Sequence, residues 1–138
     1  MALSHALACA AQRLVGTPFR LQGRDPATGL DCIGLVIASL HSVGVELELP
    51  ADYRPRRRSF TIPTLSLHAA GLIQCTGMRA AGDILLVRSG PVQVHLAIAL
   101  PDNRIVHAHA GLGRVVSSTF PAEWAIIHAW RLAPDGEP

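Results

Sequence analysis

The sequence contains no lysine, so its positive charge comes entirely from 12 arginines. Against 10 acidic residues they leave a formal net charge of only +2 at pH 7, which indicates no strongly basic surface. The one dense cluster consists of Arg54, Arg56, Arg57 and Arg58, and a cluster of this kind is typical of a solvated loop. We therefore expect no nucleic-acid partner, although the cluster could contact acidic groups of a cell wall or of a neighbouring protein.

Long apolar runs and paired cysteines are missing as well. No apolar run approaches the roughly 20 residues that cross a bilayer, so we expect no membrane span. The first residues lack the basic start of a secretory signal, and His5 interrupts their apolar run. Cys9, Cys32 and Cys75 are odd in number and form no CxxC pair, which argues against a disulfide framework or a thiolate zinc site.

What the chain does have is enough apolar material for a closed core. Hydrophobic residues make up 49% of the 138 positions, and this length is typical of one domain, so we expect a single domain over residues 1–138. Helical periodicity predicts helices over residues 3–15, from Asp31 to Gly44, and over residues 64–71. Asp31 is a suitable N-cap, which places Cys32 in the first turn of the second helix.

The second half of the sequence has the pattern of strands. Apolar runs rich in β-branched residues are separated by Ser-Gly-Pro, Pro-Asp-Asn and Gly-Leu-Gly turns, and they cover residues 83–87, 94–100, 104–110, 114–118 and 125–132. Helices followed by strands indicate an α+β domain. We predict N-terminal helices packed on a C-terminal antiparallel sheet of about five strands.

Cys32 has two interpretations. A thiol attacks as its thiolate, and the partial positive charge at a helix N-terminus lowers the pKa of a cysteine placed there. The same backbone N–H groups would stabilise the oxyanion formed when a carbonyl is attacked. The alternative is a buried structural cysteine, which is common at such positions. A histidine close enough to act as a base would favour the nucleophile.

Candidate bases lie in the segment VHLAIALPDNRIVHAHAG. Eleven residues separate His95 from His107, so a connection with an odd number of residues, centred near Pro101, would place the two rings directly opposite each other on one sheet face. His95 would then take the thiol proton, and His107 would orient the His95 ring. A two-residue turn would place them on opposite faces. His109 shares the parity of His107 and is the second choice.

The same histidines allow a metal interpretation. His107 and His109 lie on one strand face, and His95 or Cys32 could complete a zinc site. We favour catalysis without metal or cofactor, because no carboxylate or second cysteine lies at ligand spacing to close such a site.

Three stretches together resemble the NlpC-type family of papain-like cell-wall peptidases. They are GTPFRLQGRDPATGLDCIGLV, AGDILLV and HLAIALPDNRIVHA, in that order, and the resemblance covers roughly residues 3–118. It implies a papain-like fold with Cys32 as nucleophile, His95 as general base and His107 as orienting residue. It also implies hydrolysis of amide bonds in peptidoglycan stem peptides.

The sequence departs from the family pattern near the expected substrate. Phe19 replaces the usual tyrosine and Ile33 the usual serine, so two polar contacts are lost at a surface to which we also assign Asp31. An apolar residue after the cysteine, together with GRDPATGLDC, resembles the branch encoded with phage tails and gene-transfer agents. That branch implies tail-hub partners and delivery of a cytoplasmically made protein to the periplasm or cell wall by the particle. The alternative function is a weakly active or inactive structural or binding subunit of a tail hub.

Overall fold

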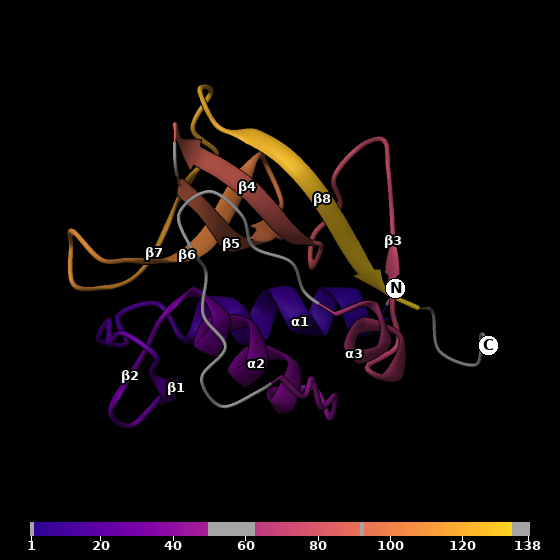
Figure 1. Cartoon of the computed structure of the whole chain (residues 1–138), viewed down its shortest axis with the longest axis horizontal. Helices are drawn as coiled ribbons and strands as arrows, with labels where there is room; N and C mark the ends of the chain where they lie inside the picture. The colour runs from indigo at the N-terminus through magenta and orange to yellow at the C-terminus, as the bar shows by residue number, and fades with distance from the viewer. Residues whose placement is uncertain (1, 50–62, 92, 134–138) are drawn as a thin grey trace.

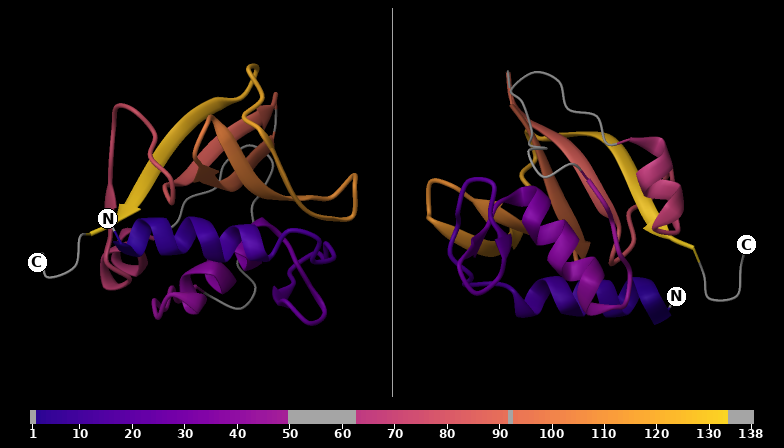
Figure 2. Two further views of the ribbon diagram at one scale, coloured as in Figure 1. Left: turned by 180° about the vertical axis from the view of Figure 1, so that it is seen from behind. Right: turned by 60° about the horizontal axis from the view of Figure 1, so that its bottom comes forward.

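The computed structural model describes residues 2–49, 63–91 and 93–133, and it has the predicted α+β architecture. Helices α1 (Ala2–Arg13) and α2 (Cys32–Ser42) lie together on one side of an antiparallel sheet (Figure 1). A third helix, α3 (Thr64–Ala69), packs beside strand β3. The helical layer and the sheet are also distinct in the two other views (Figure 2). Within the described ranges, no helix is both long and apolar enough to cross a membrane.

The sheet has six strands in the order β3-β8-β4-β5-β6-β7. All five predicted strands form, and the sequence prediction missed β3, which pairs with β8. β3 has only three residues, Leu-Ile-Gln, which is too short to show the alternation that marks a strand in a sequence. The strands are β3 (Leu72–Gln74), β4 (Ile84–Gly90), β5 (Gln93–Leu100), β6 (Arg104–His109), β7 (Arg114–Thr119) and β8 (Ala125–Leu132).

The core has two parts because strand side chains alternate between the two faces of the sheet. Leu86, Leu96 and Ile98 belong to the larger cluster, which the helices cover with residues such as Leu7 and Leu35. A smaller cluster uses the alternate positions, with Leu85, Val87, Ala97, Ala99 and Ile105 all buried. Phe120 and Trp124, from the β7–β8 connection, pack against this second cluster.

The predicted first helix is shorter than expected at its C-terminal end. It ends at Arg13 rather than near residue 15, because the chain turns away to join the sheet. Gly16 adopts a φ of +96° and donates its N–H to the Val115 carbonyl at 2.8 Å. The following segment continues this contact, since the Phe19 N–H bonds to the Gly113 carbonyl at 2.9 Å. Residues around Phe19 are thereby attached to the β6–β7 turn.

A short hairpin of strands β1 (Arg24–Asp25) and β2 (Gly29–Leu30) then leads into α2. It lies close to the β6–β7 turn at the same end of the molecule in both figures (Figure 1, Figure 2). The sequence predicts no strand in this segment. The arginine cluster at Arg54, Arg56, Arg57 and Arg58 lies outside the described residues.

The β5–β6 hairpin decides how the two candidate histidines meet. Ala99 pairs with Ile105 and Leu100 with Arg104, so the connection has three residues and is centred on Asp102. Of the two connections that the sequence leaves open, the structure has the odd-length one, and His95 and His107 share a face. The predicted centre near Pro101 is wrong by one residue. As a result, His107 is displaced diagonally from His95 instead of lying directly opposite.

Candidate functional site

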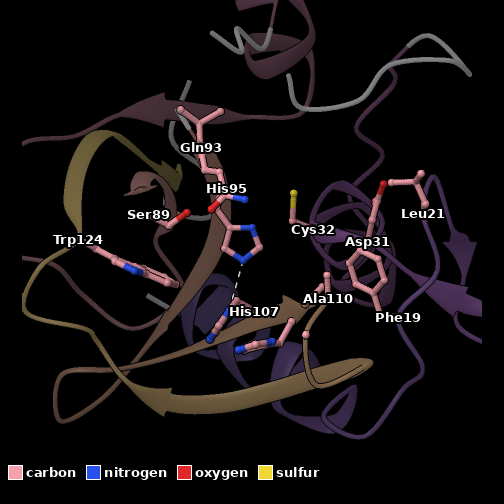
Figure 3. Close-up of a pocket in the computed structure, with 14 residues that line it drawn as sticks. Phe19, Leu21, Asp31, Cys32, Ser89, Gln93, His95, His107, Ala110 and Trp124 are labelled. Carbon is pink, nitrogen blue, oxygen red and sulfur yellow. Dashed lines mark hydrogen bonds between the residues drawn. The ribbon is translucent and has the colours of Figure 1, made fainter. Parts of the chain in front are cut away.

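A pocket of about 370 Å³ lies where the start of α2 meets the ends of β5 and β6. It brings together residues that are far apart in the sequence, and Figure 3 shows most of them as labelled sticks. The lining residues are Phe19, Leu21, Asp31, Cys32, Ser89, Gln93, Val94, His95, His107, Ala108, His109, Ala110, Gly111 and Trp124. The sequence-predicted residues Cys32, His95 and His107 are all among them.

Asp31 fixes the first turn of α2 and so fixes Cys32. As predicted, it is the N-cap: its side chain accepts the Gly34 N–H at 2.8 Å. The same carboxylate accepts the Gln22 N–H at 3.0 Å and pairs with Arg24 at 2.8 Å. A Cβ at Gly34 would lie 2.0 Å from the Gly23 carbonyl oxygen, so the preceding loop packs directly on the helix start. Asp31 lines the pocket, but its carboxylate is committed to these protein contacts.

The Cys32 side chain is 4% exposed and belongs to the edge of the main core cluster. Burial raises the pKa of its thiol to about 12; hydrogen bonds from the backbone N–H groups of Leu96 and Ile33 act in the opposite direction without overcoming burial. The backbone at the helix start thus acts in the expected direction, but burial outweighs it and the net pKa is raised instead of lowered. At neutral pH Cys32 is a thiol, and an attack through its sulfur requires a base.

His95 lies on the Cys32 side of the pocket, and its ring stands between Cys32 and His107 (Figure 3). The His95 Nε2 and His107 Nδ1 atoms are 3.2 Å apart, and His107 Nε2 is 3.4 Å from the Ser118 hydroxyl. With His95 Nε2 bonded to His107, Nδ1 is the nitrogen left to act as a base. That role requires the proton on Nε2, so His107 accepts on Nδ1 and donates from Nε2 to Ser118.

Both rings of this pair are held neutral. Burial, together with the smaller effect of the charges of His107 and His109, lowers the pKa of His95 from 6.5 to about 4. Burial and the charge of His109 also lower the pKa of His107 to about 4. A neutral His95 has a free lone pair at any pH well above 4, which is the state that a general base needs. No hydrogen bond joins the Cys32 thiol to the His95 ring among the described residues.

Trp124 covers the two imidazoles, and the sequence analysis missed it. Its ring packs edge-on against His95 at 5.9 Å and against His107 at 5.3 Å between ring centroids. Phe120 supports it with an edge contact at 6.0 Å, and the Arg79 guanidinium stacks over Phe120 at 4.4 Å. The only hint in the sequence is that one of just two tryptophans stands in a turn before the last strand. Ser89, Gln93 and Ser118 carry no comparable sequence signal.

The remaining predicted residues are divided between pocket and core. Phe19 lines the pocket, whereas Ile33 is 1% exposed, packs in the main core and does not line it. His109 lines the pocket without a hydrogen bond to His95 or His107 among the described residues. No group of three or more His, Cys, Asp or Glu side chains in the described ranges is arranged to hold a metal ion.

Comparison with known proteins agrees with this architecture. The sequence model of the NlpC/P60 family matches residues 16–128. The NlpC/p60 domain of the peptidoglycan hydrolase SagA is 25% identical, with a TM-score of 0.62 over 94% of this chain and 98% of that domain. A search among curated proteins gives no significant match.

Two other solved structures share the fold at lower identity. NlpC1 from Trichomonas vaginalis is 18% identical, with a TM-score of 0.67 over 93% of this chain and 44% of that protein. The peptidoglycan hydrolase RipB from Mycobacterium tuberculosis is 19% identical, with a TM-score of 0.60 over 95% of this chain and 65% of that one.

Proposed function

The chain belongs to the NlpC/P60 family, and on this premise we propose that it is a cysteine peptidase that hydrolyses amide bonds in peptidoglycan stem peptides. The observation that carries the proposal is the order of groups in the pocket: Cys32, then His95, then His107. The substrate class is supported by the similarity to the SagA domain, 98% of which aligns with this chain.

In the first half of the proposed reaction, Cys32 Sγ attacks the carbonyl carbon while its proton moves to His95 Nδ1. The carbonyl oxygen becomes an oxyanion next to the start of α2. The Cys32 N–H is one of the unpaired first-turn donors of the helix, with no acceptor among the described residues. It is the group placed to stabilise that oxyanion.

The second half returns the enzyme to its starting state. His95 gives the proton from Nδ1 to the leaving nitrogen, the C–N bond breaks and an amine departs from the thioester. Water then attacks the thioester carbon as His95 takes one of its protons. The C–S bond breaks, the peptide leaves as a carboxylic acid, and the proton on His95 returns to Cys32. His107 holds His95 in the required tautomer throughout.

Hydrolysis of purified stem peptides, followed by mass spectrometry of the products, tests this proposal. The wild type should release a new amine and acid pair, and Cys32→Ala should release none. Cys75→Ala is the matched control, since Cys75 is a partly exposed thiol outside the pocket and should keep full activity. A folded wild type that binds stem peptides without cleaving them would overturn the peptidase and favour the alternative of a binding subunit.

A finer proposal concerns where the enzyme acts. The run GRDPATGLDC and the apolar Ile33 after the cysteine support association with the tip of a phage-like tail, which would carry the enzyme to the periplasm or cell wall. Gradient fractionation of particles from cells that encode the chain should find it with tail proteins. Its recovery only in fractions without particles would contradict this placement.

A further inference from the structure

His109 is a pocket residue that the proposed reaction does not use. It is the last residue of β6, is partly exposed and lines the pocket. Its Nδ1 accepts the Leu112 backbone N–H at 3.0 Å. A nitrogen that accepts a hydrogen bond carries no proton, so the neutral ring must carry its proton on Nε2.

The turn that follows His109 also fixes the direction of its ring. The His109 carbonyl accepts the Gly113 N–H at 2.9 Å, so residues 109–113 form a tight hydrogen-bonded turn. A Cβ at Gly111 would lie 3.0 Å from His109 Cε1 and 3.3 Å from Nδ1, which shows how tightly the turn surrounds the ring. Protonation of Nδ1 would set two donors against each other and lose the bond to Leu112. Within the neutral ring, the turn therefore selects the tautomer with its proton on Nε2.

The Nε2–H has no acceptor in the described part of the chain. His107 is the nearest imidazole, with ring centroids 5.7 Å apart, but both of its nitrogens are engaged by His95 and Ser118. A ring with one nitrogen held by the backbone and the other unpaired at a pocket wall presents a single oriented donor. Ala110, the next residue, lines the same wall beside the β6–β7 turn (Figure 3).

We propose that His109 is a substrate-binding residue that donates a hydrogen bond from Nε2 to a carbonyl or carboxylate oxygen of the bound peptide. The inference rests on the proposed function for the identity of the peptide. It separates His109 from the catalytic residues: His95 acts on the reacting atoms and His107 orients His95, whereas His109 holds the substrate.

Two substitutions separate this role from a purely structural one. In His109→Asn, the amide oxygen occupies the place of Nδ1 and keeps the bond to Leu112, but the Nε2 donor is lost. In His109→Gln, the amide nitrogen occupies the place of Nε2 and keeps the donor, but the turn loses its acceptor. If His109 binds the substrate, His109→Asn should weaken peptide binding and His109→Gln should preserve it. If His109 only stabilises the turn, His109→Asn should keep the stability of the protein and His109→Gln should lower it.

The measurement is calorimetric binding of a synthetic peptidoglycan stem tetrapeptide to the Cys32→Ala protein, which binds without turnover. His109→Asn in this background should raise Kd about 3- to 10-fold, as expected for one neutral hydrogen bond, and His109→Gln should stay within about twofold. In the active enzyme, His109→Asn should raise KM by a similar factor and leave kcat nearly unchanged. Equal affinities of the two variants would overturn the inference.

The outcomes for the two proposals can be distinguished. Cleavage by the wild type with no difference between Asn and Gln would leave the peptidase intact and remove His109 from substrate binding. Binding that depends on His109 in a protein without cleavage would support the inference and overturn the peptidase. A wild type that neither binds nor cleaves the tetrapeptide would overturn both.

Discussion

The thiol of Cys32 faces a pocket, yet burial raises its pKa to about 12. The fraction of thiolate, which is the reactive form, then increases about tenfold for each pH unit throughout the range below that pKa. Alkylation of Cys32 by iodoacetamide should therefore accelerate about tenfold per unit from pH 7 to pH 10 without levelling off. Peptide mapping by mass spectrometry measures the rate at each cysteine separately.

A different pH dependence of the alkylation rate would change the protonation states assigned to Cys32 and His95. A rate that is already high at pH 6 and independent of pH up to 8 would show a standing thiolate and imidazolium pair in place of two neutral groups. Cys32→Ala removes the signal and confirms the peptide assignment. The same mapping of Cys9, a partly exposed thiol in α1, provides an internal reference in every sample.

Ser39 presents a separate feature of α2. Its side chain is 0% exposed, and its hydroxyl has no hydrogen-bond partner among the described residues. A buried, unpaired hydroxyl lowers stability, and alanine is also the better helix former. Ser39→Ala should raise the free energy of unfolding by about 1 kcal/mol in chemical denaturation. Ser42→Ala, at an exposed position of the same helix, should change it by less than about 0.5 kcal/mol; a destabilised Ser39→Ala would refute the unpaired hydroxyl.

The β5–β6 hairpin shows what a sequence can predict about a site. The parity of the spacing between His95 and His107 places both rings on one face for any connection of odd length. The choice among odd-length connections depends on the turn itself. Here Asp102 and Asn103 both adopt positive φ values of 64° and 59°, which centres the connection on Asp102. For a connection of odd length, the sequence spacing thus shows that the two histidines share a sheet face. The strand register depends in addition on the backbone conformations of Asp102 and Asn103.

The residues that line the pocket show what cannot be predicted from the sequence. The position of Cys32 follows from local rules, since an N-cap before an apolar helix is a sequence pattern. Trp124 reaches the imidazoles only because the β7–β8 connection folds back over the sheet and is held there by Phe120 and Arg79. The burial of Ile33 likewise depends on the rotation of α2 against the sheet. The positions of Trp124 and Ile33 depend on packing between segments that are distant in the sequence. Hydrophobic periodicity carries no information about that packing.

The β7–β8 connection gives a prediction about pH. Trp124 shields His95 and His107 from water, and burial is the main cause of their lowered pKa values. Trp124→Ala admits water, so the pKa of His95 should rise from about 4 towards 6.5. Because His95 must be neutral to act as a base, kcat/KM at pH 5 should fall several-fold relative to pH 7 in Trp124→Ala and only slightly in the wild type.

Trp124→Phe, which keeps an aromatic cover, is the matched control and should show an intermediate or wild-type profile. The measurement is kcat/KM for a stem peptide from pH 4 to pH 8. A rise in KM with an unchanged acid limb would instead show that Trp124 contacts the substrate and has no part in shielding the rings.

The neutral imidazole pair also affects the stability of the folded domain. In the folded state the pKa values of His95 and His107 are about 4, whereas the unfolded chain titrates near 6.5. Between these values the unfolded chain binds protons that the folded chain does not. The stability contributed by the neutral pair is therefore complete above about pH 6.5 and is lost as pH falls towards 4. Two protonated rings would also break the bond between His95 Nε2 and His107 Nδ1.

We expect the wild type to lose about 4 kcal/mol more stability between pH 7 and pH 5, about 2 kcal/mol for each ring, than a variant carrying both His95→Asn and His107→Asn, as measured by urea unfolding at each pH. His68→Asn, at an exposed position of α3, should follow the wild type. Parallel curves for the wild type and the double variant would mean that the imidazoles protonate in the folded protein as readily as in the unfolded chain. In that case the pair would not remain neutral in the acid range, and His95 would be available as a base only at higher pH.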